Sequence, residues 1–303
     1  MQDRESRVFS FRYMMAGAAV LALAACAAVP DNGPVAVAAV PYVHDVVESP
    51  TPGDYRAHVV TIDLTHPGLR FGVTPADNSQ GMEFTGRLTS TYLQETGAVL
   101  AINANYFLPF KGGSNGGDNY YPHVGQPVNA SGAVLSGGRI VSPVETDIDD
   151  RVDSMICFEQ VRVAIVQGQV CPQGFTDGVA SGPHLLQAGQ RLAFDPKYDE
   201  AYRNQRQPRT SMGISADGSR AFIIVVDGRQ AHSAGATMTE LQDLFLELGA
   251  SDAINLDGGG SSTLAAEGVD GQPKLLNSPI HTRVPGRERP VANHVLLFKD
   301  DAR

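Results

Sequence analysis

The sequence predicts a mixed α/β (or α+β) domain, in which a mixed β-sheet carries flanking helices and many loops. In the last hundred residues, apolar runs of strand length alternate with a helix-like segment, which is typical of a sheet with helices packed on it. The 303 residues include 32 glycines and 19 prolines, which indicates a loop-rich chain. A hydrophobic share of 42% excludes an intrinsically disordered protein.

The amino terminus has the pattern of an export signal. Three arginines within residues 1–12 precede an apolar run over residues 14–25. The run ends in LAAC at residues 23–26, which resembles the bacterial lipobox, where the cysteine is lipidated and becomes the first mature residue. We therefore expect residues 1–25 to be a lipoprotein signal peptide and Cys26 to carry the lipid. The alternative is an ordinary secretory signal with an incidental cysteine.

A tether and one domain are expected after the signal. Residues 26–51 are rich in Ala, Val and Pro and suit an extended tether, the end of which also suits an edge strand. Residues 52–303 show no internal repeat and are expected to form a single domain. This organisation predicts an exported protein anchored to the bacterial envelope, at the outer membrane or in the periplasm. The lipid would be its contact with the membrane, and no pattern indicates an oligomeric state.

The three cysteines fit an exported protein. If Cys26 carries a lipid, Cys157 and Cys171 remain, and they can pair in an oxidising compartment. Two buried free thiols are the alternative.

Strand-like and helix-like patterns follow one another along the domain. Residues 111–150 are irregular and rich in glycine pairs, and residues 195–208 are polar, which favours a surface excursion. The elements predicted from the patterns are strands at 58–64 and 69–73, a helix at 87–97 closed by Gly97, a buried strand at 99–102, strands within 155–171, and a final strand at 291–298.

Two further buried strands each end in an aspartate. The run at 221–226 ends at Asp227, and the run at 253–256 ends at Asp257. A helix joins them over residues 237–249, opening with a capping box and closing at a glycine. Because a right-handed crossover brings the carboxyl ends of two such strands to one edge of the sheet, both carboxylates are placed where α/β proteins bind ligands.

The segment after Asp257 is the strongest candidate for chemistry. Three consecutive glycines let the backbone approach a ligand closely and can present N–H groups as an anion-binding nest, and Ser261 and Ser262 add hydroxyls. A β-turn explains most Asp-Gly pairs, and it is an equal alternative for Asp227 with Gly228. It explains the run of three glycines poorly, because a turn does not require them.

Further polar candidates lie elsewhere in the chain. Asn103 and Asn105 leave a strand on one face, although asparagines there also bond to their own backbone in turns. Arg209 and Arg283 are able to pair with an anion bidentately, the alternative being ordinary surface positions. His123 follows a glycine-rich loop and is a weaker candidate for the cleft.

Other classes of site are disfavoured. The formal charge of −10 argues against a nucleic-acid partner, because phosphate backbones require clustered Lys and Arg. No histidine pair has the HxH or HExxH spacing of a zinc site, and neither GxSxG nor a P-loop is present. We therefore expect no metal and no cofactor.

Several sequence blocks stand out along the domain: AINANYF (101–107), PRTSMGISADG (208–218), VVDGR (225–229), TMTELQDLFLELGASDAINLDGGGSST (237–263), and Arg283 with VANHVLLF (291–298). Together these blocks resemble the phosphodiester glycosidase family. The resemblance implies removal of a sugar from a sugar-1-phosphodiester, with the phosphate left on the other partner. The residues that it implies are Asp257 and Asp227 as catalytic groups, and Asn103, Asn105, Arg209, Gly228, Gly258, Gly259, Gly260, Ser261, Ser262, Arg283 and Asn293 for substrate binding.

The chemistry of such a bond suits these residues. A phosphodiester is already a weak base when it leaves, so an acid that protonates it adds little. The site must instead stabilise the departing phosphate, through arginines and backbone N–H groups, and place a carboxylate at the anomeric carbon. We therefore expect an exported glycosidase that acts on sugar-1-phosphodiesters of envelope or extracellular glycans. The alternatives are a non-catalytic exopolysaccharide-binding lipoprotein and a metal-dependent phosphodiesterase that cuts the P–O bond.

Overall fold

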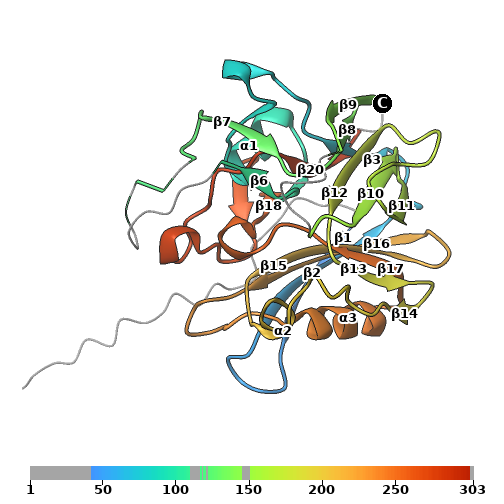
Figure 1. Ribbon diagram of the computed structural model, residues 1–303, viewed down its shortest axis with the longest axis vertical. Helices are drawn as coiled ribbons and strands as arrows, with labels where there is room; N and C mark the ends of the chain where they lie inside the picture. Colours follow the sequence, from blue (N-terminus) through green and yellow to red (C-terminus); the bar gives the residue numbers. More distant parts are fainter. Residues whose placement is uncertain (1–41, 110–116, 118, 121, 145–150, 301–303) are drawn as a thin grey trace, which may run out of the picture. The chain divides into compact units, whose positions relative to one another are not determined.

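The largest sheet of the computed structural model is antiparallel and carries the strands that end in Asp227 and Asn255 (Figure 1). Both β16 and β17 pair antiparallel with β15, which lies between them, so they run parallel to each other and end at the same edge. This confirms the expected common edge. The strand order is β1 (Tyr42–Glu48), β2 (Arg56–Asp63), β16 (Arg220–Asp227), β15 (Arg209–Ser215), β17 (Ala250–Asn255), β13 (His184–Gln187) and β14 (Gln190–Arg191).

The structure describes residues 42–109, 117, 119–120, 122–144 and 151–300. All of them belong to one compact unit, Val35–Arg303. The expected signal peptide, the lipidated Cys26 and most of the expected tether lie outside the described residues. The end of that tether forms the edge strand β1, paired with β2, as the alternative for this segment anticipated.

Three further sheets are antiparallel as well. The strand order of the first is β11 (Arg162–Gln167), β10 (Ser154–Glu159), β12 (Asp177–Ser181), β8 (Val134–Ser136) and β9 (Arg139–Ser142). The order of the second is β19 (Pro273–Leu275), β18 (Leu264–Glu267), β5 (Leu100–Asn103), β20 (His294–Lys299) and β3 (Leu69–Val73). The third consists of β4 (Phe84–Thr85), β7 (Pro127–Ala130) and β6 (Phe107–Leu108), in that order.

Three α-helices occur among the described residues: α1 (Thr89–Thr96), α2 (Glu200–Asn204) and α3 (Met238–Glu247). Helix α1 ends at Gly97 in the left-handed conformation, and α3 begins with the Thr237–Glu240 capping box, as the sequence predicts. Short 3₁₀ turns are η1 (Ser79–Gly81), η2 (Gly259–Ser261) and η3 (His281–Arg283). None of the helices in the described part of the chain is long and apolar enough to cross a membrane.

The fold class needs correction. The protein is mostly β, with 43% strand and 13% helix, rather than an α/β fold built on one mixed sheet. One strand not predicted from the sequence is β15, whose sequence RTSMGIS offers only Met212 and Ile214 as large apolar residues, although all seven residues are buried. Residues 111–150, expected to be irregular, also contain β7, β8 and β9.

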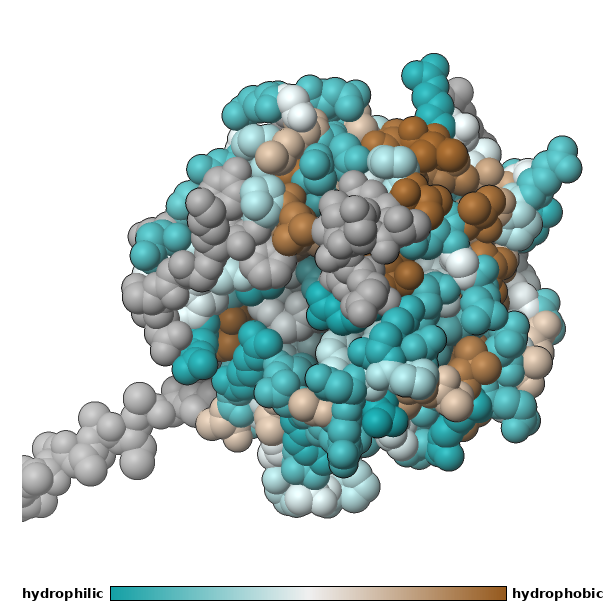
Figure 2. Space-filling model, viewed as in Figure 1, coloured by the Kyte–Doolittle hydropathy of each residue, from teal (hydrophilic) through white to brown (hydrophobic). Residues whose placement is uncertain are grey.

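Two large apolar clusters hold the sheets together. One cluster is formed by buried side chains from strands of several sheets, and it includes Ile62, Ile102 and Ile254. The other packs α3 against the opposite face of the seven-stranded sheet, where Figure 1 shows α2 and α3. The stripe predicted for α3 lies in this cluster. The face in Figure 2 is mostly hydrophilic, with hydrophobic residues in separate groups.

A disulfide joins Cys157 in β10 to Cys171, which confirms the expected pairing. We expect replacement of both cysteines by alanine to lower the free energy of unfolding by about 3 kcal/mol, because the crosslink closes a loop of roughly 15 residues in the unfolded chain. Urea unfolding of the oxidised protein and of the double variant measures this difference. Two alkylatable thiols in the freshly purified, unreduced protein would contradict the pairing.

Candidate active site

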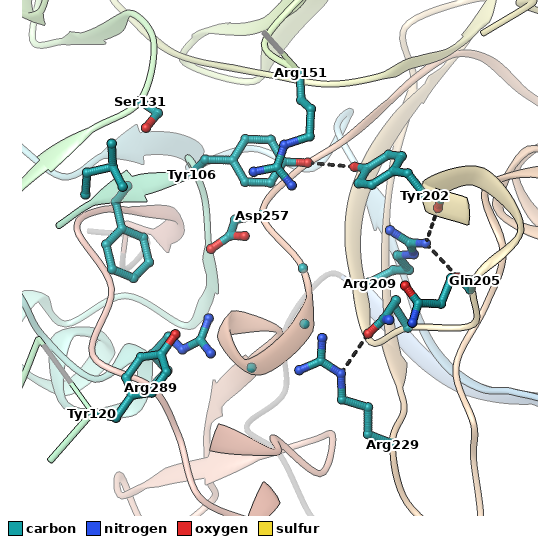
Figure 3. A pocket seen from close by; sticks show the side chains of 16 residues that line it. Tyr106, Tyr120, Ser131, Arg151, Tyr202, Gln205, Arg209, Arg229, Asp257 and Arg289 are labelled. Carbon is teal, nitrogen blue, oxygen red and sulfur yellow. Dashed lines mark hydrogen bonds between the residues drawn. The ribbon is translucent and has the colours of Figure 1, made fainter. Parts of the chain in front are cut away.

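A cavity of about 600 Å³ opens where β17 ends (Figure 3). Its wall is formed by side chains from segments far apart in the sequence. The described lining residues are Tyr106, Phe107, Leu108, Tyr120, Ser131, Arg151, Tyr202, Gln205, Gln207, Arg209, Arg229, Asp257, Gly258, Gly259, Gly260 and Arg289.

Asp257 lies at the centre of this view, with its backbone fixed from the neighbouring sheet (Figure 3). The Asn103 Nδ2 donates to the Asp257 carbonyl at 2.6 Å, and the Asp257 N–H donates to the Ala104 carbonyl at 2.9 Å. The Asn103 Oδ1 also accepts from the Thr210 hydroxyl at 2.8 Å. Residues of β5 and β15 therefore hold the start of the glycine segment.

The carboxylate of Asp257 has a perturbed acidity. Burial raises its pKa to about 6, although Arg289, the Ser261 hydroxyl, Arg151 and the Gly258 N–H favour the ionised form. Of the described residues that line the cavity, Asp257 alone carries a carboxylate. A carboxyl group that titrates near neutrality in a cavity is typical of a catalytic acid or base.

Four arginines are among the described lining residues: Arg151, Arg209, Arg229 and Arg289. The Arg289 Nη1 donates to the Ser261 hydroxyl at 3.2 Å, which connects this cation with the segment after Asp257. The Arg229 Nε donates to the Gln207 side chain at 2.7 Å. Together, Arg229 and Arg289 flank the glycine segment and are suited to hold a phosphate group (Figure 3).

Arg209 is buried and its guanidinium is largely used within the protein. Its Nε donates to the Ala236 carbonyl at 3.1 Å, and its Nη2 donates to the carbonyls of Tyr202 and Gln205 at 3.2 and 3.0 Å. Burial lowers the pKa of Arg209 below its ordinary value. Arg209 therefore has a structural role in addition to the expected role in substrate binding, because these hydrogen bonds fix the segment that carries Tyr202.

The glycines after Asp257 are needed for close packing. A Cβ on Gly258 would lie 2.8 Å from the Pro208 carbonyl oxygen, and one on Gly260 would lie 2.5 Å from the Arg289 Nη2. The Gly259 N–H donates to the Pro208 carbonyl at 2.8 Å. This N–H is therefore not available to the anion-binding nest that the sequence predicts. The glycines instead allow the side chains of Arg229 and Arg289 to approach the backbone.

Ser261 and Ser262 differ in their positions. Ser261 is buried and accepts from Arg289, so it couples the arginine to Asp257. The Ser262 hydroxyl is buried, has no hydrogen-bond partner among the described residues, and does not line the cavity. Ser261 does not line the cavity either, but it acts on the site through its hydrogen bonds with Arg289 and the Asp257 carboxylate.

Two tyrosines complete the upper wall in Figure 3. The hydroxyls of Tyr106 and Tyr202 share a hydrogen bond at 3.0 Å, and the Arg151 guanidinium lies 4.4 Å from the centre of the Tyr106 ring. Burial raises the pKa of Tyr106 well above 10, so its hydroxyl stays protonated. Tyr202 belongs to the segment expected as a surface excursion; Tyr198 in that segment is in fact buried.

Three asparagines expected to bind substrate contact protein groups instead. Asn103, Asn105 and Asn293 are buried and do not line the cavity. The Asn293 Nδ2 donates to the Asn105 Oδ1 at 2.8 Å, and the Asn293 Oδ1 accepts from the Asn105 N–H at 3.0 Å. We therefore assign them a positioning role, because their amides connect neighbouring strands.

Three other candidates also lie outside the cavity lining. Arg283 is exposed, and the arginine of its segment that lines the cavity is Arg289. Gly228 is buried where a Cβ would lie 2.5 Å from the Pro208 nitrogen. His123 lines a second cavity of about 360 Å³ rather than the first.

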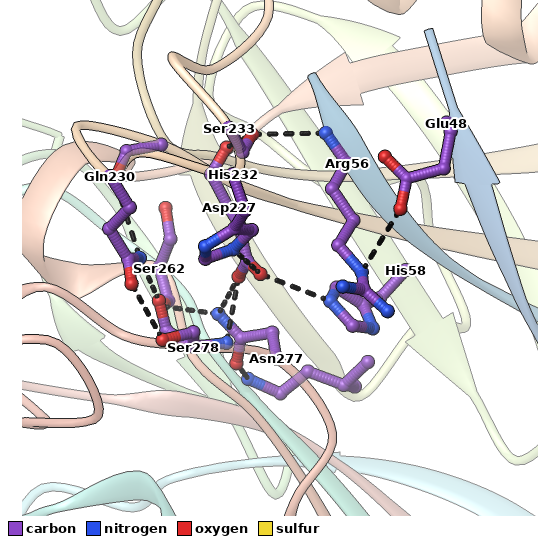
Figure 4. A network of polar contacts seen from close by, with 12 residues as sticks. Glu48, Arg56, His58, Asp227, Gln230, His232, Ser233, Ser262, Asn277 and Ser278 are labelled. Carbon is purple, nitrogen blue, oxygen red and sulfur yellow. Dashed lines mark hydrogen bonds and ion pairs between the residues drawn. The ribbon is translucent and has the colours of Figure 1, made fainter. Parts of the chain in front are cut away.

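Asp227 lies in a separate polar network (Figure 4). Its Oδ2 contacts the Nε2 atoms of His58 and His232 at 3.3 and 3.0 Å, and its Oδ1 accepts from the Ser278 N–H at 2.7 Å and from the Asn277 Nδ2 at 3.3 Å. Burial acts to raise its pKa, but the hydrogen bonds from His232, His58 and Ser278 outweigh this and lower the pKa to about 2. Asp227 does not line the cavity, and this geometry gives it a structural role.

We expect Asp227 to stabilise the fold at neutral pH and to stop doing so in acid. Because its folded-state pKa lies below its ordinary value, the stabilisation is present above about pH 4 and is lost as pH falls toward 2, amounting to about 2 kcal/mol. The measurement is the free energy of unfolding of the wild type and of Asp227→Asn between pH 2 and 6. The difference between the two should shrink in acid, whereas exposed Asp195→Asn should show no such trend.

Sequence reasoning missed Arg151, Arg229, Arg289, Tyr106 and Tyr202 as lining residues, although Arg229 and Tyr106 lie inside the quoted blocks. A signal was available for Arg289, which stands two residues before the final block VANHVLLF. No group of three or more His, Cys, Asp and Glu side chains arranged to hold a metal ion is found in the part of the chain that the structure describes.

Comparisons with known proteins bear on the same residues. A model of the phosphodiester glycosidase family matches residues 96–298, which include Asp257 and its glycine segment. A prophage-derived uncharacterized protein of Bacillus subtilis, YomE, is 46% identical over 65 residues, which is 22% of this chain and about a tenth of that protein's length.

Solved structures share the fold. The catalytic domain of zebrafish N-acetylglucosamine-1-phosphodiester alpha-N-acetylglucosaminidase, auto-inhibited by its pro-peptide, superposes with a TM-score of 0.61 and 15% identity, over 88% of this chain and 87% of that one. A hypothetical protein from Synechocystis gives a TM-score of 0.56 and 18% identity, over 86% of this chain and 62% of that one. At these identities the similarity is one of fold.

Proposed function

Because this chain belongs to the phosphodiester glycosidase family, we propose that it hydrolyses the bond between the anomeric carbon and the phosphate oxygen of a sugar-1-phosphodiester. The zebrafish domain with the same fold is named for action on such a diester. The cavity around Asp257 is the place proposed for this reaction.

The observation that carries the proposal is the pairing of Asp257 with arginines across the glycine segment. Among the described residues that line the cavity, Asp257 is the one that carries a carboxylate. Arg289 is linked to the segment that follows Asp257 through the Ser261 hydroxyl. Arg229 faces the same segment from the other side (Figure 3). A sugar above Asp257 with its phosphate between Arg229 and Arg289 brings the scissile C–O bond to the carboxylate.

The reaction needs charge stabilisation at both ends of that bond. The C–O electron pair moves to the phosphate oxygen, and Arg229 and Arg289 stabilise the resulting phosphate monoester of the alcohol. Positive charge develops at the anomeric carbon, where the ionised Asp257 stabilises it. Water then supplies the hydroxyl of the free sugar, and its second proton is released.

Hydrolysis in ¹⁸O-labelled water tests the proposal. A set of sugar-1-phosphodiesters is incubated with the protein, and the products are analysed by mass spectrometry. Label in the released sugar supports C–O cleavage. Label in the phosphate would instead assign a phosphodiesterase, and binding of a glycan without turnover of any diester would assign a non-catalytic binding protein.

We also propose that the protein is exported and is anchored to the envelope through a lipid on Cys26. At that location, its proposed substrates are envelope or extracellular glycans. The sequence LAAC at residues 23–26 supports this proposal. Cys26→Ser is expected to abolish labelling by a fatty-acid probe and to move the protein from the membrane to the soluble exported fraction. A wild-type protein that stays with the membrane without acquiring label would contradict lipidation.

A further inference from the structure

The two arginines that flank the glycine segment are each held through Nε by an uncharged acceptor. The Arg229 Nε donates to the Gln207 Oε1 at 2.7 Å, and the Arg289 Nε donates to the His281 Nδ1 at 3.2 Å. Because the His281 Nδ1 accepts here, it carries no proton and the ring is neutral. Burial also lowers the pKa of His281 to about 4, which favours this neutral form at neutral pH. The Arg289 Nη1 donates to another uncharged group, the Ser261 hydroxyl.

The same guanidiniums approach the glycine segment from two sides (Figure 3). A Cβ on Gly259 would lie 3.1 Å from the Arg229 Nη2, and one on Gly260 would lie 2.5 Å from the Arg289 Nη2. Because a guanidinium is planar, a contact at Nε fixes the direction in which the Nη atoms point. The two uncharged acceptors therefore determine how both cations face the place proposed for the phosphate.

Arg206, the residue before Gln207, is held in the opposite way. Its guanidinium donates to the Glu240 carboxylate at 2.8 and 2.9 Å and to the Asp54 carboxylate at 2.7 Å. Two carboxylates thus compensate its charge, and Arg206 does not line the cavity. Carboxylates hold this arginine, which joins segments of the protein, whereas an amide and an imidazole hold the two arginines that face the cavity.

Positive charge is therefore concentrated at the cavity. Burial and the neighbouring cations Arg289, Arg209 and Arg283 lower the pKa of Arg229, although a guanidinium stays protonated at neutral pH. Like charges that are close together repel one another, and an anion bound between Arg229 and Arg289 relieves that repulsion. A carboxylate acceptor in place of the amide or the imidazole would compete with the anion for the guanidinium.

Gln207 is suited to orient Arg229 because their two segments are joined through the main chain. The Gln207 N–H donates to the Ala236 carbonyl at 3.3 Å, and the Ala236 N–H donates to the Gln207 carbonyl at 3.0 Å. The Arg229 N–H donates to the Ala234 carbonyl at 3.1 Å, and the Arg229 φ of 57° lies in the left-handed region, which costs energy in a residue other than glycine. The main chain thus constrains the amide and the guanidinium relative to each other.

We propose that Gln207 and His281 are positioning residues whose lack of charge is required, because they orient Arg229 and Arg289 toward the phosphate and leave the charge of both cations for it. This inference rests on the proposed function. A carboxylate at either position would keep the direction of the guanidinium but compensate its charge. An apolar side chain would leave the charge but not the direction.

The test separates charge from orientation at Gln207, which is half-buried. Gln207→Glu keeps an acceptor of almost the same shape and adds a negative charge, whereas Gln207→Met removes the acceptor with little change in size. Gln207→Glu should weaken the binding of inorganic phosphate at pH 7, measured by calorimetry, about tenfold and lower kcat/KM for the sugar-1-phosphodiester by a similar factor. Gln207→Met should lower both severalfold and less than Gln207→Glu does.

The matched control is Gln190→Glu, which adds the same charge at an exposed residue that lines neither cavity and should keep wild-type values in both measurements. A purely structural role of Gln207 predicts the reverse order, with Gln207→Glu closer to the wild type than Gln207→Met, because only Glu retains the acceptor.

His281→Leu is the parallel variant for Arg289. It should lower kcat/KM about tenfold, because the hydrogen bond that fixes the guanidinium is lost. It should also move the acidic limb of the pH profile upward, since a displaced Arg289 favours the ionised form of Asp257 less. His281→Gln, which offers an uncharged acceptor, should recover part of both effects. His281 is buried, so thermal unfolding checks each variant, and the Gln207 variants decide the inference if His281→Leu does not fold.

Two results would overturn the inference and leave the proposed function standing. One is a Gln207→Glu variant that hydrolyses the diester and binds phosphate at least as well as the wild type, and the other is a Gln207→Met variant that equals the wild type in both measurements. Absence of diester turnover by the wild type, with the expected order of phosphate affinities, overturns the proposed function and supports the two acceptors as positioning residues of an anion site.

Discussion

Asp257→Asn is expected to lower kcat/KM for a sugar-1-phosphodiester by a factor of about 10² to 10⁴. The amide keeps the shape of the side chain but removes the negative charge that the positive anomeric carbon requires. The backbone contacts with Asn103 and Ala104 involve main-chain atoms of Asp257 and are unaffected by the change. Steady-state kinetics measure the loss, and circular dichroism checks that the fold is intact.

The control for this variant is Asp252→Asn, which removes a carboxylate from β17, the strand that precedes Asp257, at a residue outside the cavity lining. It should retain near wild-type kinetics. In the wild type, kcat/KM should rise as pH increases through about 6, because the pKa of Asp257 lies there and the ionised form is the active one. An Asp257→Asn variant with most of the wild-type activity, or with the same acidic limb, would remove Asp257 from the mechanism.

Arg289→Gln is expected to lower kcat/KM by a factor of about 10² to 10³, since it removes a cation from the departing phosphate. It should also move the acidic limb of the pH profile upward, because Arg289 favours the ionised form of Asp257 and its loss raises the pKa of that carboxyl. With an activated leaving group the loss should be smaller, since such a group needs less stabilisation. The measurement is the pH dependence of kcat/KM for a native and an activated diester.

Arg283→Gln is the informative control. The family resemblance places Arg283 at the substrate, whereas the structure leaves it exposed and outside the lining of the cavity. A change of less than about threefold in kcat/KM is expected for Arg283→Gln, well below the loss expected when Arg289 no longer stabilises the departing phosphate. If the two variants exchanged their effects, the phosphate position between Arg229 and Arg289 would be wrong.

Much of the local structure was predictable where short-range chemistry determines it. The capping box at Thr237 and the glycine at the end of α1 gave correct helix limits, and the buried strands that precede Asp227 and Asp257 were placed at one sheet edge. Burial on both faces makes such strands continuous apolar runs, which are visible in a sequence.

The fold class was wrong because pairing partners are not local. β15 lies between two apolar strands, yet its polar side chains are buried through contacts such as that of Thr210 with Asn103. Nothing within a window of a few residues reveals such a partner, so a strand of this kind reads as polar surface.

The candidate site shows the same division. Asp257 and the three consecutive glycines that follow it form an unusual run that is visible in the sequence, and they line the cavity. Tyr202 and Arg151 reach it from distant segments, and only the tertiary arrangement shows this. Asp227, like Asp257, follows a buried apolar run in the sequence. Two of the groups that contact its carboxylate, His58 and Asn277, lie in other parts of the chain, whereas His232 is only five residues away.

The attachment of Asp257 to Asn103 has a consequence for how the site meets its ligand. Asn103 belongs to β5, while the Thr210 that donates to it belongs to β15 of the seven-stranded sheet. The loop that carries the carboxylate is therefore held through hydrogen bonds that involve both sheets. Because much of its conformational entropy is lost when the chain folds, little ordering cost of this loop remains to weaken affinity when a diester arrives.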